Sequence, residues 1–347
     1  MDHGAVVDDE GDTAQHSWDC GRERLWNLFY EDARLSVHAK DFLESVFAND
    51  FNCWKAFQVK HTEVEDSQAK ALSELQAVQA ELHWWGEANR VLFDPSKESF
   101  HLLHRRFFSG DDFKLLGVVF DPQLLMHRAA REVATEAGWR LQTLLKVRRF
   151  FTTPELFRMY KAQVLSYVES GTPALYHAAR SVLDRVDRVQ RRFLRELDYS
   201  EKDALVDYRL APLDSRRDMA MLAVLHKVTL GTAPAKLKAL FPPKPAAEVL
   251  FDRHRLRRWR PPHDKQLYTE CTFQSTDVLQ NSLFGLVHCY NRLPPELVAV
   301  ETVKGFQRQL QGALRKCAES GLPEWNLLYS SAWKRLPLTN FDAFFRS

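Results

Sequence analysis

Long apolar runs are missing from this sequence of 347 residues. No stretch comes near the roughly 20 consecutive apolar residues that a membrane-spanning helix needs. The first residues, MDHGAVVDDEGD, have neither the basic start nor the apolar core of a secretory signal. The sequence therefore predicts a chain without a membrane partner, in an intracellular compartment that is cytoplasmic or nuclear.

Motifs for common metal, nucleotide and nucleophile sites are missing as well. The five cysteines are an odd number, are scattered and form no CxxC pair, which favours free thiols in a reducing compartment. Cys271, His288 and Cys289 lack the spacing of a zinc finger. The sequence contains no GxxxxGK[ST], GxGxxG, GxSxG or HExxH. It therefore shows no signature of a P-loop, a dinucleotide fold, a serine hydrolase or a zinc protease.

Charge is present in both signs but is unevenly distributed. Residues 1–100 hold 20 acidic and nine basic side chains, whereas residues 101–347 hold 26 acidic and 39 basic ones. We expect the two parts to meet different partners, or each other. A basic body of this size suits a phosphate backbone, although charge alone identifies neither a nucleotide sequence nor a reaction.

The first third of the sequence predicts mixed secondary structure. Residues 1–20 hold six acids and no Lys or Arg, which is typical of a disordered tail. Thr62 and Glu65 form a capping box for a long amphipathic helix, and Gly86 marks its expected end. The other expected elements are a helix at 25–35, two strands in 42–57 around a turn at Ala48-Asn49, and strands at 90–93, 99–104 and 113–120.

From about residue 125 the apolar spacing is close to 3.6, which predicts helix after helix. Thr153, Pro154 and Glu155 form an expected helix start. The Pro-rich segment 241–248 is the best candidate for a domain boundary, and an Arg tract follows at 251–265. The expected helices are 127–150, 154–169, 180–198, 214–231, 278–291 and 302–318.

The stretch FAND, residues 47–50, raises a chemical question. An apolar strand runs into Asn49 and Asp50, and acid pairs placed at such a turn can hold catalytic metal ions. Here one member of the pair is an amide. Three interpretations are open at this point: a metal site, a degenerate metal site, or a plain hairpin.

The motifs between residues 25 and 120 follow the order of the second half of a polymerase palm, and their detail resembles non-LTR retrotransposon (LINE-type) reverse transcriptases. FAND resembles the family's Phe/Tyr-Ala-Asp-Asp box, and WGEANRVLFDPSKESFHLL (85–103) resembles its lysine segment. FKLLGVVFD (113–121) resembles the strand that grips the primer. Downstream, the segments 144–176 and 183–197 resemble the thumb region, and NSLFGLVHCYNRLPPELV (281–298) resembles the C-terminal N-x-L-P segment. The resemblance covers about residues 21–335 and depends on the order and spacing of these motifs.

The resemblance implies an α+β fold, in which a truncated palm remnant precedes a mainly α-helical thumb-like and C-terminal body. It implies RNA-directed DNA polymerase (nucleotidyltransferase) ancestry, with Mg²⁺ as the cofactor. The implied site positions are Asn49, Asp50 and Lys97 for catalysis, Leu116 and Gly117 for the primer grip, and Asp50 for the metal. The expected regions are an acidic tail (1–20), a partial palm (21–122), a thumb-like region (123–240), a Pro/Arg-rich linker (241–265) and a C-terminal helical region (266–347).

Several departures from the family pattern bear on activity. Asn49 stands where the family has its first Asp, and an amide oxygen brings no charge to a hard cation such as Mg²⁺. The family's earlier acidic strand and its Pro-Gln-Gly segment have no clear match, because CGRERLWNLF occupies the corresponding place. These departures predict a catalytically inactive, truncated remnant in which FAND is a degenerate metal box.

Arginines cluster in the helical part, and they are the candidates for contact with RNA or DNA. In 181–197 a stripe of arginines runs beside an apolar stripe, and residues 253–260 hold five arginines. The alternatives are a solvated charged flank for the first cluster, and docking against the acidic N-terminal third for the second. The candidate residues are Arg148, Arg149, Arg185, Arg188, Arg192, Arg195, Arg253, Arg255, Arg257 and Arg258.

Three functions therefore remain open from the sequence. The first is a fragment of a retroelement protein that binds nucleic acid through its basic helical body. The second is a non-enzymatic nucleic-acid-binding or scaffold protein. The third is a polymerase completed in trans by another retroelement chain that carries the fingers and the rest of the palm.

Overall fold

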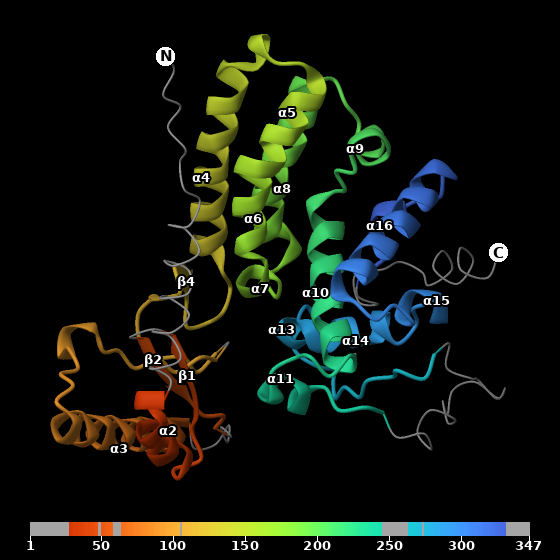
Figure 1. Cartoon of the computed structure of the whole chain (residues 1–347). Coiled ribbons are helices and arrows are strands. Elements are labelled where there is room, and N and C mark those ends of the chain that lie inside the picture. The colour runs from red at the N-terminus through yellow and green to blue at the C-terminus, as the bar shows by residue number, and fades with distance from the viewer. Residues whose placement is uncertain are drawn as a thin grey trace, which may run out of the picture. The chain divides into compact units, whose positions relative to one another are not determined.

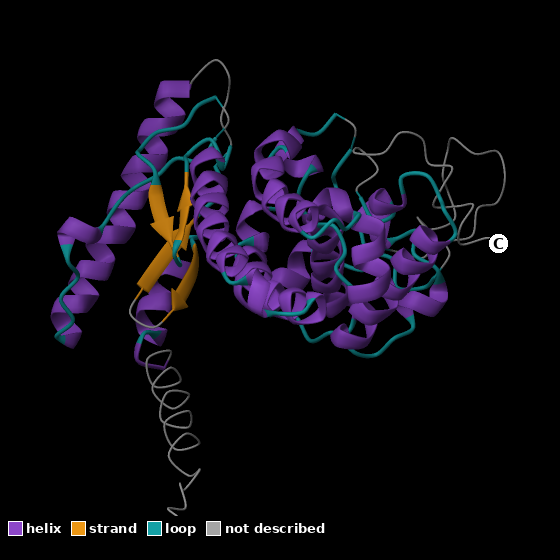
Figure 2. Cartoon of the chain, turned by 90° about the horizontal axis from the view of Figure 1, so that it is seen from above, coloured by secondary structure: helices purple, strands orange, loops and turns teal. Residues whose placement is uncertain are grey.

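The computed structural model describes residues 28–47, 50–57, 64–104, 106–244, 263–272 and 274–330. The chain divides into two compact units, Met1–Asp111 and Asp112–Ser347. Within the described ranges the fold is α+β and mostly helical, with two small antiparallel sheets of two strands each (Figures 1 and 2). The expected α+β class is confirmed at this level. None of the helices in these ranges is long and apolar enough to cross a membrane.

A β-hairpin between two helices forms the first unit. Helix α2 (Glu31–His38) precedes strands β1 (Leu43–Phe47) and β2 (Asp50–Trp54), and the long helix α3 (Val64–Asn89) follows. Phe47 pairs with Asp50 across the hairpin, so the turn is two residues long, as the sequence predicts. The acidic tail, Ala48, Asn49 and Thr62 lie outside the described residues.

Two predictions for the end of this unit are wrong. Helix α3 continues past Gly86 to Asn89. Gly86 does not end the helix but lets the Val91 backbone pack closely against it, since a Cβ at this position would lie 2.7 Å from the Val91 carbonyl oxygen. The strands expected at 90–93 and 99–104 do not form. Instead, the Asp94 side chain caps a 3₁₀ turn, η1 (Pro95–Lys97), and only an isolated bridge joins Leu102 to Ser109.

The continuous strand expected at 113–120 is also wrong, because this segment is a hairpin. Strands β3 (Phe113–Leu115) and β4 (Val118–Phe120) pair across a turn made of Leu116 and Gly117, both of which have positive φ. Such two-residue turns match the twist of the flanking strands, and glycine adopts their backbone angles without strain. The hairpin belongs to the second unit, where β4 contacts the first long helix.

The first helices of the second unit follow the predicted spacing closely. One correction concerns the start of α5, which is capped by Thr152 and not by Thr153, since Glu155 accepts a hydrogen bond from the Thr152 N–H at 2.8 Å. In chain order the elements are α4 (His127–Lys146), η2 (Arg148–Phe150), α5 (Thr153–Tyr160), the π-helical η3 (Lys161–Leu165), α6 (Ser166–Ser170), α7 (Thr172–Leu175), α8 (Arg180–Glu196), α9 (Glu201–Tyr208), α10 (Leu213–Thr229) and α11 (Ala235–Leu240).

The last part of the unit is helical too. The single helix expected at 278–291 is divided in two, because the Ser282 hydroxyl accepts a hydrogen bond from the Phe284 N–H and starts a new helix. The elements are α13 (Asp277–Gln280), α14 (Leu283–Tyr290), α15 (Pro295–Val298), α16 (Val303–Glu319) and the 3₁₀ turn η4 (Trp325–Leu327).

Two large hydrophobic clusters fill the second unit. In the first, Phe193 of α8 stacks on Tyr160 of α5 with ring centroids 4.2 Å apart. The second gathers α10, α14 and α16 around Tyr290 and Phe306, which are both fully buried. Phe241, the first residue of the Pro/Arg-rich linker, and Leu267, just after the linker, both belong to this second cluster.

Candidate nucleic-acid interface and the palm-like hairpin

We call the β1–β2 hairpin the palm-like hairpin, because its FAND stretch resembles the Phe/Tyr-Ala-Asp-Asp box. It presents one described carboxylate at its turn. Asp50 begins β2 and is exposed, whereas Asn49 lies outside the described residues. Among the described residues, no three His, Cys, Asp or Glu side chains lie close enough together to hold a metal ion. Mg²⁺ takes most of its ligands from oxygens and prefers anionic ones. The donors described here therefore do not fit the Mg²⁺ site that the resemblance implies.

The other positions implied by the resemblance are exposed. Lys97 ends the 3₁₀ turn η1 with its side chain 83% exposed, and its Nζ lies 3.6 Å from Asp94 Oδ2. Leu116 and Gly117 form the turn of the β3–β4 hairpin, and Leu116 is 60% exposed. Lys97 belongs to the first unit, and the turn belongs to the second.

Sequence reasoning missed a buried carboxylate in the palm-like hairpin. The Glu44 side chain is 1% exposed, accepts a hydrogen bond from Arg34 Nε at 2.8 Å and lies 3.2 Å from His38 Nε2. The signal was the strand alternation, because Phe42, Glu44 and Val46 occupy the same face of β1. Glu44 has a structural role here, since it ties β1 to α2.

Helix α8 has one apolar face and one cationic face. The apolar spacing in 181–197 predicts a buried stripe of Val182, Val186, Val189, Phe193 and Leu197; the first four are buried, and Leu197, just after the helix, is half-buried. Four arginines at 3-4-3 spacing are exposed on the other side. At about 100° per residue they fall within about 80° of arc, and they span about 15 Å along the helix. We call these four the arginine row: Arg185, Arg188, Arg192 and Arg195.

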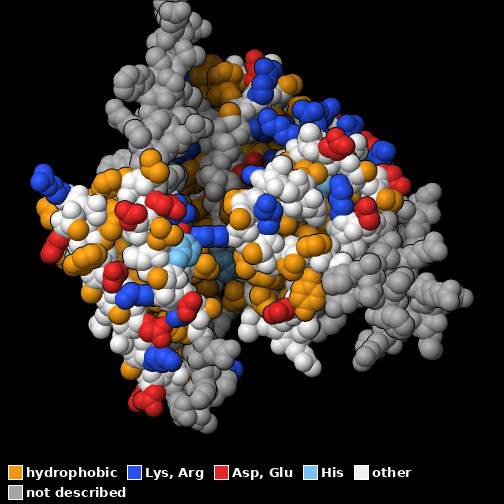
Figure 3. Space-filling model, turned by 60° about the horizontal axis from the view of Figure 1, so that its bottom comes forward, with side chains coloured by type: hydrophobic (Ala, Val, Ile, Leu, Met, Phe, Trp, Pro, Cys, Tyr) orange, Lys and Arg blue, Asp and Glu red, His pale blue; other side chains and the backbone are white. Residues whose placement is uncertain are grey.

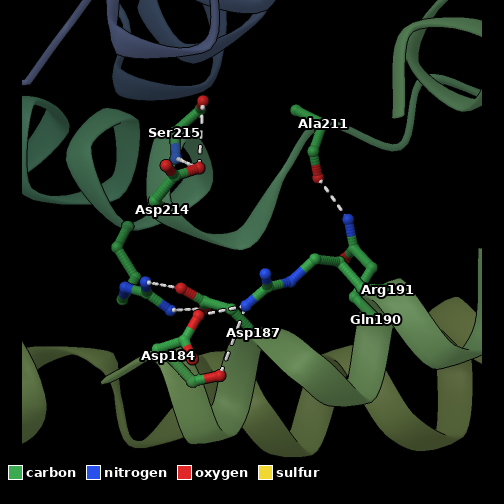
Figure 4. Close-up of polar contacts among 8 residues, drawn as sticks. Asp184, Asp187, Gln190, Arg191, Ala211, Asp214 and Ser215 are labelled. Atoms are coloured by element: carbon green, nitrogen blue, oxygen red, sulfur yellow. Dashed lines mark hydrogen bonds and ion pairs between the residues drawn. The ribbon is translucent and has the colours of Figure 1, made fainter. Parts of the chain in front are cut away.

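The acidic side chains of α8 are drawn away from this row or are already paired. Asp187 turns toward α10, where Arg217 donates two hydrogen bonds to its carboxylate, at 2.7 and 2.9 Å (Figure 4). Asp184 accepts from Arg188 and Arg191, and Glu196 accepts from Arg148 Nη1 at 2.8 Å. The three acidic side chains of α8 are therefore all paired, Asp184 in part with Arg188 of the row itself.

Three members of the arginine row are available to bind another molecule. Arg185, Arg192 and Arg195 have no hydrogen bond or ion pair to any described residue. A guanidinium is charged at every accessible pH and presents its donors in a fixed fork. The row is therefore a strip of positive charge that suits phosphate or carboxylate groups.

Polar groups between α8 and α10 fix the direction in which the row points. Gln190 Nε2 donates to the Ala211 carbonyl oxygen at 2.9 Å, one turn of α8 after Asp187 (Figure 4). Burial raises the pKa of Asp214, which accepts the Ser215 N–H at 2.7 Å, and burial also raises the pKa of Glu201. Perturbed carboxylates can mark active sites, but the hydrogen bond described for Asp214 lies within the first turn of α10.

The two arginines of η2 lie at the connection between α4 and α5. Arg148 donates to the Glu196 carboxylate and, at 3.2 Å, to the Glu196 carbonyl oxygen. The Arg149 guanidinium lies over the Phe150 ring, 4.7 Å from its centroid. The structure therefore places Arg148 at the C-terminal end of α8, next to the last member of the arginine row.

The second arginine cluster predicted from the sequence falls outside the described residues. It consists of Arg253, Arg255, Arg257 and Arg258. Its part in binding thus remains a prediction from the sequence alone. Comparison of the chain with protein-family models, with curated proteins and with solved structures finds no match.

Proposed function

We propose that this protein binds RNA or DNA through the arginine row of α8, and that it descends from a non-LTR reverse transcriptase without retaining polymerase activity. The observation that carries the binding proposal is the row itself. Four exposed guanidiniums lie opposite the buried face of one helix, and three of them have no partner among the described residues. The ancestry proposal depends on the order of the sequence motifs.

The dimensions of the row suit a phosphate backbone. Its length of about 15 Å compares with about 3.4 Å per nucleotide along one strand of a duplex, so it can face about four phosphates. Phosphate contacts of this kind set affinity and position but carry no base information. We therefore expect binding without strong sequence preference.

The proposal of lost activity depends on the donor set. Two-metal phosphoryl transfer needs several carboxylates that hold both ions against the reacting oxygens. Asp50 is the described carboxylate at the hairpin turn, and its neighbour Asn49 is an amide. Together the two residues supply a single negative charge, which is too little to hold two divalent ions.

A salt titration of the triple variant Arg185→Gln, Arg192→Gln, Arg195→Gln tests the binding proposal. Loss of three phosphate contacts should flatten the slope of log affinity against log salt, by about 2 for a single strand and about 3 for a duplex. Oligonucleotides of unrelated sequence should lose affinity to the same extent. Binding is measured by fluorescence anisotropy at several salt concentrations.

A matched variant controls for net charge. Arg128→Gln, Arg140→Gln, Arg315→Gln also removes three positive charges, but these arginines are paired with Glu132, Glu136 and Glu319 on α4 and α16. We expect this control to change the salt slope much less. An unchanged slope for the α8 variant, or equal changes in both variants, contradicts the proposal.

A further inference from the structure

The connection between α4 and α5 exposes two adjacent aromatic rings. Phe150 is 68% exposed and Phe151 is 40% exposed. A buried Phe side chain typically contributes about 1.5–3 kcal/mol relative to an exposed one, so presenting two of them to solvent costs stability. This connection, residues 148–151, is called the tip; it exposes apolar surface that a binding partner could cover.

The tip is a fixed turn. Residues 148–150 form the 3₁₀ turn η2, and Thr152 begins α5 through a complete capping box with Glu155. The Thr152 N–H and hydroxyl both donate to Glu155, each at 2.8 Å. The two rings thus project from a short, hydrogen-bonded connection, which holds them ready for a partner without a large ordering cost.

The rings are surrounded by positive charge. One face of the Phe150 ring carries the Arg149 guanidinium. Arg148 reaches Glu196, which directly follows Arg195, so the C-terminal end of the arginine row lies next to the tip. The Glu196 carboxylate is neutralised by Arg148, whereas the Glu155 carboxylate accepts the Thr152 hydrogen bonds and keeps its charge.

Exposed aromatic rings beside a row of guanidiniums match one kind of occupant. Unpaired bases have free faces that stack on aromatic side chains, whereas the bases of a duplex are already stacked. We infer that the tip formed by Phe150 and Phe151 is a stacking platform for the bases of a single-stranded nucleic acid, whose phosphates follow the arginine row. This inference is an extension of the proposed function and depends on it.

The variant Phe150→Leu, Phe151→Leu tests the platform, because leucine remains apolar but has no aromatic face. The probes are a fluorescent single-stranded DNA of about 12 nucleotides, the same strand with abasic residues, and its duplex, within the site sizes of about 4–16 nucleotides known for stacking proteins. We expect at least a five-fold loss of affinity for the normal strand, from about 1 kcal/mol or more per stacked base. Affinity for the duplex and for the abasic strand should not change, nor should the salt slope.

Trp139→Leu is the matched control. Trp139 is 64% exposed on α4, about 10 Å along that helix before its last residue, Lys146, and its replacement should leave all three affinities at the wild-type level. The inference is overturned if the Phe variant binds the normal strand as wild type does, or loses affinity for all three probes alike. Either result leaves the proposed function intact as long as the α8 triple variant still flattens the salt slope. If the triple variant does not flatten the salt slope, the proposed binding of phosphates by the arginine row is contradicted instead.

Discussion

The two units differ most in how much core they build. Among the described residues of the first unit, the buried clusters are small: Tyr30, Ala33 and Trp85 in one, and Val37, Phe42 and Val78 in the other. In the second unit, two extensive clusters join nearly every long helix. The first unit also leaves large apolar side chains in solvent, including Leu28 at 73%, Trp84 at 67% and Leu92 at 93%. Figure 3 shows one face of the molecule, on which exposed apolar side chains appear in orange among the charged ones.

This difference in core size indicates which of the two units is the better candidate for binding nucleic acid. The first unit contains the motifs that resemble the chemical part of a polymerase, yet its described residues offer neither a metal-ligand set nor a large core. The second unit combines a large core with an excess of basic residues. A rigid framework can hold a row of like charges in place, and this favours the helical unit as the binding part.

Each unit also holds a carboxylate that an arginine neutralises, and these two pairs allow a direct test. In the helical unit, the side chains of Arg217 and Asp187 are 9% and 19% exposed and meet through two hydrogen bonds. In the first unit, the side chains of Arg34 and Glu44 are 33% and 1% exposed, and Glu44 also has His38 as a neighbour. Removal of Arg217 takes away both hydrogen bonds described for the Asp187 carboxylate, whereas removal of Arg34 leaves Glu44 with His38.

The largest effect is expected from Arg217→Met. It leaves Asp187 poorly solvated and without its counter-charge, which should lower the free energy of unfolding of the helical unit by about 3 kcal/mol. Arg34→Met in the first unit should cost less, about 2 kcal/mol for one hydrogen bond to a charged group, because the buried Glu44 carboxylate keeps His38 Nε2 as a neighbour at 3.2 Å. Amide hydrogen exchange resolved by segment reports the two units separately.

The double variant Asp187→Leu, Arg217→Met provides the control. It removes both charges, so most of the lost stability should return, as happens when buried ion pairs are replaced by apolar side chains. If Arg217→Met costs no more than Arg34→Met, the buried pair is not what joins α8 to α10.

A smaller effect is expected when the pH is lowered. Burial lowers the pKa of His226, His263 and His288 in the helical unit. Between the folded pKa and the unfolded value of about 6.5, the unfolded chain binds more protons, so stability falls as the pH drops below about 6.5. Each histidine contributes a slope of at most about 1.4 kcal/mol per pH unit. Urea unfolding at several pH values between 7.5 and 5.5 measures how the free energy of unfolding changes with pH.

One substitution checks the source of this slope. His288 Nε2 lies 2.9 Å from the Cys271 carbonyl oxygen, and His288→Gln keeps a donor there but cannot take up a proton. The variant should show a shallower loss of stability with acid. Burial raises the pKa of Glu201 and Asp214, and these acids favour the folded state at lower pH, so the range stops at pH 5.5. An identical slope in the variant would contradict the assignment to His288.

The sequence predicts the helical unit much better than the first unit. The 3.6-residue spacing in α8 identifies its buried face and its arginine row directly, because both faces repeat along one long helix. The pairing of Asp187 with Arg217 could not be predicted, since 30 residues separate them and only the tertiary packing brings them together. Just after the strand expected at 90–93, the Asp94 side chain caps the 3₁₀ turn η1, and the segment 99–104 forms only the isolated bridge from Leu102 to Ser109.

The smallest effect concerns the turn of the palm-like hairpin. We expect Asn49→Asp to leave primer extension on an RNA template at the level of a buffer control, with Mg²⁺ or with Mn²⁺, as for the wild type. The change adds one carboxylate next to Asp50, but two-metal chemistry needs a further acid, and no described residue brings a third ligand to the turn. Like-charge repulsion between the two neighbouring aspartates would also oppose their joint ionisation. Templated extension by the single variant would show that the chain already holds the remaining ligands, and the first unit would then be the catalytic part.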